Sequence, residues 1–285
     1  MTASFGRRLA EAMAQRGPLC AGIDPHPQLL AHAGMDDTVD SLRRFTDIMM
    51  EAVAGRVAAV KPQSAFFERH GAAGVAVLEH LLADLSSTQT LSILDVKRGD
   101  IGSTMAAYAQ AYLADDAPLA ADAITVSPYL GFGSLSPALD LAQGSGRGVF
   151  VLALTSNPEG AQIQQRGTPP VAAEILTQVA RRNAAAPAEE AGLASVGVVV
   201  GATLGPTLNR LGLQDHLRSC AGPILAPGVG AQGASAADLA HGFEGSTERV
   251  LAPVSRGLLS SGGGVAAIRE QCRKLNGELR ESLWE

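Results

Sequence analysis

Two carboxylates and a lysine lie within six residues of one another, directly after a short apolar segment. The segment Leu91–Leu94 has the length and composition of a buried strand, and Asp95-Val-Lys97-Arg-Gly-Asp100 follows it. Because side chains alternate between the two faces of a strand, Asp95 and Lys97 are expected on one side and Val96 on the other. Burying a carboxylate and an ammonium costs several kcal/mol per ion in lost hydration. A strand end that carries both is therefore a candidate for acid-base or electrostatic catalysis.

The same pattern has a structural interpretation. Asp95 and Lys97 can form an ion pair at the strand end, while Asp100 caps the helix that follows. Spacing alone leaves both interpretations open.

Eight short apolar segments recur along the chain and are the expected strands. They are separated by segments rich in Ala, Leu, Glu and Arg with helical periodicity, such as 41–53, 74–85 and 171–185. Strands that alternate with helices pair in parallel, and eight such units predict a closed (β/α)8, or TIM, barrel. A doubly wound open sheet is the alternative. The expected strands are Leu19–Ile23, Val57–Val60, Leu91–Leu94, Ala123–Val126, Val149–Leu154, Val196–Val200, Ile224–Ala226 and Val250–Val254.

The chain shows no linker. No change of composition divides its 285 residues, so we expect 1–285 to form one domain. The longest irregular stretches are expected at 157–170 and 232–248, each following a strand, where functional loops are expected.

Polar residues follow most of these strands, where a barrel enzyme carries its chemistry. Each has an ordinary explanation on its own, as a turn residue or a lysine that extends its ammonium to solvent. Their convergence on one rim is the stronger signal. They are Asp24, Lys61, Asp95, Lys97, Ser127, Ser156, Asn157, Gly228, Gly230, Gln232 and Arg256.

The residues after the last two strands suggest a phosphate site. Gly228 and Gly230 leave backbone N–H groups open to an anion, and Arg256 can hold phosphate through a bidentate fork. Loops in these positions are the usual phosphate site of such barrels. A glycine turn beside a surface arginine is the alternative.

Composition excludes several classes of protein. A formal charge of −6 and a pI near 5.5 argue against nucleic acid or an anionic membrane as partner. No apolar run approaches the roughly 18 residues of a membrane span, and the N-terminus lacks a signal-peptide core. Three widely spaced cysteines without a CxxC motif are typical of a reduced protein, so we expect a soluble, cytoplasmic chain.

The sequence contains no motif for several other kinds of active site. The six histidines show no pair at metal-ligand spacing, and no metal site is expected. The chain lacks a GxSxG elbow for a serine hydrolase, and no GxGxxG follows the first strand.

The chain resembles the orotidine 5′-phosphate decarboxylase family, particularly its longer bacterial members. The resemblance runs from Leu19 to about Gly262, and Asp95-x-Lys97-x-x-Asp100 is its most specific motif. That motif is shared with related barrels, but its combination with the others is highly specific. The supporting motifs are Gly22-Ile-Asp24-Pro, Val60-Lys61-Pro-Gln, Thr125-Val-Ser-Pro-Tyr129, Thr155-Ser-Asn-Pro158, Ala226-Pro-Gly-Val-Gly230-Ala-Gln232 and Ser255-Arg256-Gly257.

The resemblance implies loss of CO2 from orotidine 5′-monophosphate to give UMP, without a metal or other cofactor. It further implies a homodimer in which Lys61, Asp95 and Lys97 form a charge network with Asp100 of the second subunit. Ile101 and Thr104 are expected to accompany Asp100 across that interface.

The remaining site residues follow from the same resemblance. Asp24 is expected at the ribose hydroxyls with Lys61 nearby, and Ser156 at the pyrimidine. Gly230, Gln232 and Arg256 are expected at the phosphate.

The residue types fit this reaction. Decarboxylation at C6 of the pyrimidine leaves a carbanion, which the Lys97 ammonium can stabilise and then protonate. Asp95 lies close to the expected position of the departing carboxylate and can destabilise the ground state. Flanking carboxylates also keep Lys97 charged, which argues against a Schiff-base aldolase, whose lysine must be neutral to attack.

Two further alternatives stay open. A Mg2+-dependent sugar-phosphate decarboxylase or aldolase of the same barrel type would carry an acidic ligand where this chain has Lys61. A non-catalytic nucleotide-binding barrel would have no need for a lysine held between carboxylates.

Overall fold

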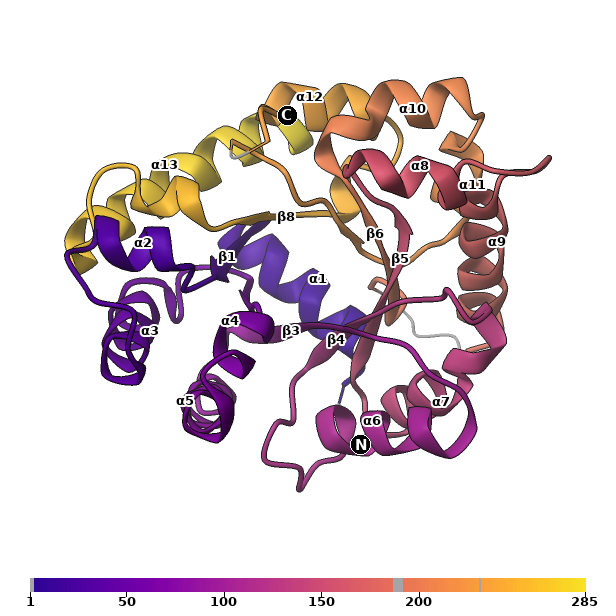
Figure 1. The fold of residues 1–285 in the computed structure, drawn as a ribbon. Coiled ribbons are helices and arrows are strands. Elements are labelled where there is room, and N and C mark those ends of the chain that lie inside the picture. The colour runs from indigo at the N-terminus through magenta and orange to yellow at the C-terminus, as the bar shows by residue number, and fades with distance from the viewer. Residues whose placement is uncertain (1–2, 187–191, 231) are drawn as a thin grey trace.

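Eight parallel strands close into a barrel in chain order, with β8 paired to β1 (Figure 1). The computed structural model describes residues 3–186, 192–230 and 232–285, and the strands are counted within these ranges. Each strand overlaps one of the expected segments, so the TIM-barrel prediction is confirmed. The strands are β1 (Leu19–Ile23), β2 (Ala59–Pro62), β3 (Leu91–Arg98), β4 (Ala123–Val126), β5 (Gly148–Leu154), β6 (Val196–Val200), β7 (Ile224–Leu225) and β8 (Val250–Val254).

Helices surround the strands, and their buried faces form the main core with the outer face of the barrel. The three helices expected from periodicity correspond to α3, α5 and α9. The α-helices are α1 (Phe5–Arg16), α2 (Pro27–His32), α3 (Val39–Val53), α4 (Ala65–Glu68), α5 (Gly71–Ser86), α6 (Gly102–Leu113), α7 (Ser136–Gly144), α8 (Ala161–Gln164), α9 (Val171–Ala184), α10 (Gly205–Arg210), α11 (Gln214–Ser219), α12 (Ala236–Gly242) and α13 (Val265–Trp284).

The two stretches expected to be irregular each contain a short helix, so that expectation was wrong. α8 lies within 157–170 and α12 within 232–248. α12 begins with a capping box, in which Ser235 and Asp238 each bond the backbone N–H of the other. Helices this short span at most two turns, too few for apolar periodicity to reveal them.

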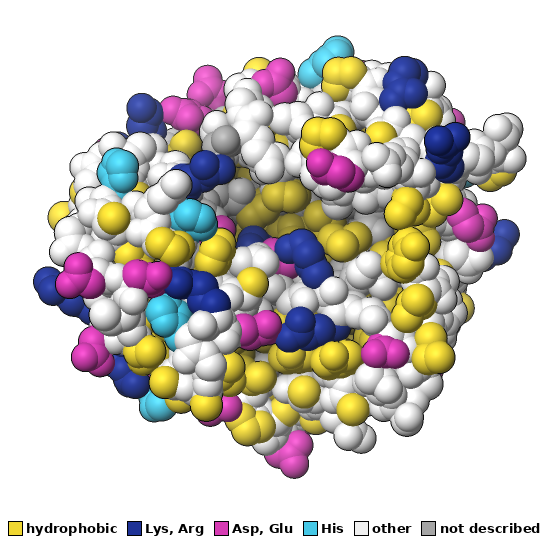
Figure 2. Space-filling model, viewed as in Figure 1, with side chains coloured by type: hydrophobic (Ala, Val, Ile, Leu, Met, Phe, Trp, Pro, Cys, Tyr) yellow, Lys and Arg dark blue, Asp and Glu magenta, His cyan; other side chains and the backbone are white. Residues whose placement is uncertain are grey.

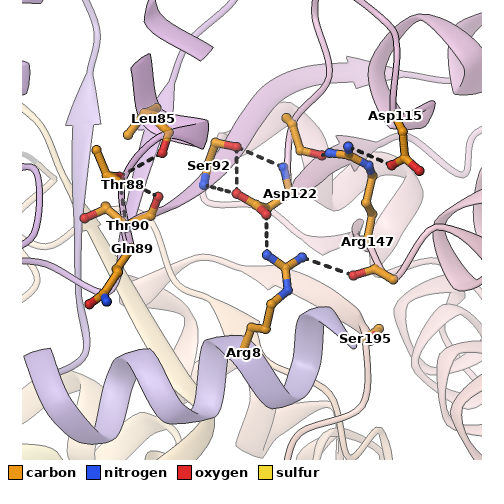
Figure 3. Close-up of polar contacts among 12 residues, drawn as sticks. Arg8, Leu85, Thr88, Gln89, Thr90, Ser92, Asp115, Asp122, Arg147 and Ser195 are labelled. Atoms are coloured by element: carbon orange, nitrogen blue, oxygen red, sulfur yellow. Dashed lines mark hydrogen bonds and ion pairs between the residues drawn. The ribbon is translucent and has the colours of Figure 1, made fainter. Parts of the chain in front are cut away.

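α1 closes the end of the barrel where the strands begin. Phe5 packs edge-on against Phe150 of β5, with ring centroids 5.9 Å apart. Gly148 leaves room for it, because a Cβ there would lie 2.2 Å from the Phe5 ring. The Arg8 guanidinium pairs with Asp122, whose carboxylate also accepts hydrogen bonds from the backbone and hydroxyl of Ser92 (Figure 3). With this end sealed, the open end is the one where the strands finish.

Candidate active site

A cavity of about 560 Å³ opens at the carboxyl ends of the strands, within the size range of small-molecule sites. Figure 2 shows the hollow near the centre of this face, with hydrophobic side chains at depth and charged ones beside them. Leu152, Val199, Leu225 and Pro253 contribute apolar lining. The arrangement offers a flat organic ring an apolar surface next to a concentrated group of charges.

The charges form a chain in which carboxylates and ammoniums alternate. Lys61 Nζ lies 3.7 Å from Asp24 Oδ1 and 3.1 Å from Asp95 Oδ2. Lys97 Nζ lies 2.6 Å from the other Asp95 oxygen, Oδ1. Asp95 therefore binds both lysines, one through each oxygen.

Burial and pairing act on this chain in opposite directions. Burial alone would raise the pKa of Asp95, but Lys61, Lys97 and a hydrogen bond from Thr125 together hold it well below its usual range. Burial alone would lower the pKa of Lys61, and the carboxylates of Asp24 and Asp95 outweigh it and raise that pKa. The buried pair is therefore ionised at neutral pH.

The two lysines differ in their access to a ligand. Lys61 is 6% exposed and surrounded by its partners. The side chain of Lys97 is 46% exposed and lines the cavity. The chain contains only one other lysine, Lys274. Lys97 thus presents an ammonium to the cavity while Lys61 holds the carboxylates in place.

β3 is longer than expected and presents Asp95 and Lys97 through an irregular backbone. It pairs with β4 at Leu94 and again at Arg98, with a shift of register between them. Lys97 has a φ of 46°, in the left-handed region that non-glycine residues rarely adopt. The expectation that Asp95 and Lys97 share one side is confirmed by their contact, and Val96 packs into the core.

Asp24 is held by a residue from the far end of the chain. Ser255, directly after β8, donates a hydrogen bond of 2.5 Å to Asp24 Oδ2. Gly22 makes this approach possible, because a Cβ there would lie 2.0 Å from the Ser255 hydroxyl oxygen. Gly22 and Ser255 stand in motifs that the sequence shows at two strand ends, but only the pairing of β1 with β8 brings these two residues together.

The opposite part of the rim carries a free cation. Arg256 lines the cavity and is exposed, and its guanidinium forms no ion pair or hydrogen bond with any residue that the structure describes. Ser156 Oγ donates to Gln232 Oε1 at 2.7 Å and so links the loops after β5 and β7. This contact leaves the amide N–H groups of Gln232 as donors. Gly230 adopts a φ of 69°, as glycine can without strain, and its backbone N–H donates to the Ala234 carbonyl at 2.8 Å. The expectation that this N–H is open to an anion was therefore wrong.

Asp100, Ile101 and Thr104 do not line the cavity of their own chain. Asp100 accepts a hydrogen bond from the Ile101 backbone at 2.8 Å, and Ile101 is 61% exposed. The interpretation of Asp100 as a helix cap is wrong, because α6 begins at Gly102, its N-cap position is Ile101, and no side chain caps it. Tyr129 is 73% exposed in the neighbouring loop. These residues form an outward-facing surface with apolar members.

Three side chains hold the site although their spacing assigned them no role: Thr125, Ser255 and Gln63. Gln63 Oε1 lies 3.4 Å from the Lys61 ammonium and also lines the cavity. Gln63 and Ser255 stand in motifs at the ends of strands, which is the signal that could have identified them. Thr125 lies inside β4, where a buried threonine is ordinary.

Within the described ranges, no group of three His, Cys, Asp or Glu side chains could hold a metal ion. None of the helices there combines the length and apolar character that a membrane crossing needs.

Known proteins resemble this chain over nearly its whole length. The Orotidine 5′-phosphate decarboxylase / HUMPS family model matches residues 17–271. The chain is 53% identical over 283 residues to the orotidine 5′-phosphate decarboxylase of Salinispora arenicola, covering 98% of both chains. It is 52% identical over 282 residues to that of Streptomyces coelicolor, again covering 98% of both.

Solved structures agree with these matches. A structure from Streptomyces avermitilis is 50% identical, with a TM-score of 0.92, and the match covers 100% of this chain and 97% of that one. The OMP decarboxylase of Leishmania donovani is 31% identical, with a TM-score of 0.71, over 97% of this chain and 99% of that one.

Proposed function

Because this chain belongs to the orotidine 5′-phosphate decarboxylase family, it converts orotidine 5′-monophosphate to UMP and CO2, and we propose that Lys97 is the residue that stabilises and protonates the carbanion. The observation that carries this assignment is the exposed Lys97 ammonium, held 2.6 Å from a buried carboxylate at the cavity wall.

The reaction breaks the bond between C6 and the carboxylate carbon and leaves its electron pair on C6. The Lys97 ammonium stabilises that charge electrostatically and transfers a proton to C6. The neutral amine then regains a proton from water. Asp95 orients the ammonium and places negative charge beside the substrate carboxylate, which favours its departure as neutral CO2.

The rest of the substrate is assigned to groups around the rim. Asp24 and Lys61 bind the ribose hydroxyls, and Ser156 faces the pyrimidine. Gln232 and Arg256 bind the phosphate, supported by the unpaired guanidinium and the amide donors described above, and Gly230 shapes the loop that carries Gln232. Phosphate binding far from C6 supplies energy for holding the reacting ring in place.

The active unit is a homodimer with shared sites. Asp100, Ile101 and Thr104 do not line their own cavity, and the apolar side chains of Ile101 and Tyr129 are exposed. An exposed apolar surface of this kind is typical of a protein interface. Asp100 of one subunit thus completes the charge network of the other.

We further assign the enzyme to the cytoplasm, where the three free, buried cysteines stay reduced. Residues 1–285 act as one catalytic domain, which the family match over 17–271 supports.

The direct test follows the absorbance change when purified protein is mixed with orotidine 5′-monophosphate, with and without EDTA. Full turnover in EDTA is expected, whereas loss of turnover would favour the Mg2+-dependent alternative. Lys97→Ala should abolish turnover, and Lys274→Ala, a change at an exposed lysine in α13, should not. Turnover by Lys97→Ala would remove the proposed role of Lys97.

Hybrid dimers test the shared site. Asp100→Ala and Arg256→Ala proteins should each be nearly inactive, because each damages both sites of its own dimer. A mixed dimer has one intact site, so an equimolar, randomly exchanged mixture should recover about a quarter of wild-type activity. No recovery after verified subunit exchange would contradict a site built from two subunits.

A further inference from the structure

The Thr125 hydroxyl touches both residues at the centre of the reaction. It donates a hydrogen bond of 2.7 Å to Asp95 Oδ1 and accepts one of 3.0 Å from the backbone N–H of Lys97. Thr125 is 1% exposed and lies at the wall of the cavity, beside Asp95 and Lys97. A single buried oxygen therefore joins the carboxylate of one residue to the backbone of the other.

The register of the sheet explains why a side chain is needed there. Leu94 pairs with Ile124 and Arg98 with Val126, so three residues of β3, Asp95 to Lys97, lie opposite Thr125 alone. In a regular parallel ladder, each backbone N–H that points toward the neighbouring strand meets a backbone carbonyl there. The bulge removes that partner from Lys97, and the Thr125 hydroxyl takes its place.

The same bond fixes an unusual backbone. The φ of 46° at Lys97 is disfavoured for a residue with a Cβ, and such a conformation persists only where its surroundings hold it. Lys97 is held at two points, by its N–H on Thr125 and its ammonium on Asp95. Both contacts depend on Thr125, because its hydroxyl accepts the Lys97 N–H and also donates to Asp95 Oδ1, the oxygen that binds the Lys97 ammonium.

We propose that Thr125 is a positioning residue of the decarboxylation, whose hydroxyl holds the Asp95 carboxylate and the left-handed Lys97 backbone so that the Lys97 ammonium enters the cavity in reacting geometry. The inference rests on the proposed role of Lys97. Thr125 also lines the cavity, but its hydroxyl is used in these two bonds, and the residues assigned to ribose and phosphate lie in or after other strands. Its loss should therefore slow the chemical step and leave substrate binding intact.

The test compares Thr125→Val, which keeps the shape and loses the hydroxyl, with Thr125→Ser, which keeps the hydroxyl. For Thr125→Val, kcat should fall by about ten- to a hundredfold, the effect of losing one hydrogen bond to a charged group. KM and the affinity for UMP, measured by calorimetry, should change less than about twofold, and Thr125→Ser should keep kcat within about threefold.

Thr90→Val is the matched control. Thr90 is also buried and accepts a backbone N–H, from Gly55 at 2.7 Å, but it lies before β3 at the closed end of the barrel. It should lose stability without losing kcat. If Thr125→Val does not fold, Thr125→Ala takes its place in the comparison with Thr125→Ser.

The outcomes separate this inference from the proposed function. A wild-type kcat in the variant without the hydroxyl, or an equal loss in Thr125→Ser, overturns the role of Thr125 while Lys97→Ala stays inactive. A fall in UMP affinity that matches the fall in kcat overturns it as well, because it shows general damage to the site. Turnover by Lys97→Ala instead overturns the proposed function itself.

Discussion

Lys61 holds two carboxylates at the base of the site, and replacing it with methionine removes the charge while keeping most of the volume. Asp24 Oδ1 is buried, accepts no hydrogen bond within the described part of the chain, and has the Lys61 ammonium 3.7 Å away. Asp95 lies 3.1 Å from the same ammonium. Lys61→Met therefore leaves two carboxylates partly or wholly buried with less compensation.

The expected loss of stability follows from these contacts. Removing one partner of a buried ion pair costs about 3–5 kcal/mol in the free energy of unfolding. Lys97 still pairs with Asp95, and Asp24 is partly open to solvent, so the lower end applies. We expect a loss of about 3 kcal/mol at pH 7, which lowers the Tm by roughly 6–12 °C in a protein of this size.

The loss should depend on pH in a defined direction. Against the effect of burial, Lys61 and Lys97 hold the pKa of Asp95 below its unfolded value, so this group stabilises the fold above about pH 4 and ceases to do so as the pH falls further. The raised pKa of Lys61 keeps it charged throughout this range. Without Lys61, the pKa of Asp95 rises, and protonation relieves the buried charge. The difference between wild type and variant should therefore shrink as the pH falls through the raised pKa of Asp95 in the variant.

Urea unfolding followed by circular dichroism measures this difference, at one protein concentration because a dimer unfolds in a concentration-dependent way. Lys274→Met is the control, since Lys274 is exposed and should change stability by less than about 0.5 kcal/mol. A loss below about 1 kcal/mol for Lys61→Met, or a loss that grows as the pH falls, would refute the reasoning.

Two further changes test the two sides of the rim. Arg256→Ala should lower kcat/KM by about a hundredfold and weaken UMP binding, measured by calorimetry, because it removes a charged phosphate ligand; unchanged UMP affinity would contradict that role. Gly22→Ala places a Cβ where a contact of 2.0 Å forces Ser255 away from Asp24, so kcat/KM should fall at least about tenfold. Gly277→Ala, with no atom within 4 Å of the added Cβ, should leave activity unchanged, and equal effects of the two alanines would exclude the clash as the cause.

The barrel could be predicted from the sequence because its signal is local. Each strand is a short apolar run between polar turns, and eight of them in alternation with helices leave few topologies. The side-chain alternation of a strand was also enough to place Asp95 and Lys97 together. The C-terminal end of β3 could not be predicted in this way, because the apolar run ends at Leu94 while the strand continues to Arg98.

The local interpretation of Asp100 failed for a related reason. An aspartate before a helix usually caps it, but the cap depends on backbone angles that the motif does not reveal. In the structure Ile101 occupies the N-cap position of α6, which begins at Gly102, and Asp100 does not line its own cavity.

The sequence by itself determined the barrel, the rim of polar residues and the common side of Asp95 and Lys97, because main-chain periodicity and the hydrophobic pattern act over neighbouring residues. Only the tertiary structure decided which distant groups hold them. Ser255 reaches Asp24 across 231 residues of chain, and Thr125 faces the bulge of β3 from the next strand. These contacts depend on strand register and barrel closure, which arise from packing of the whole chain and leave no local pattern.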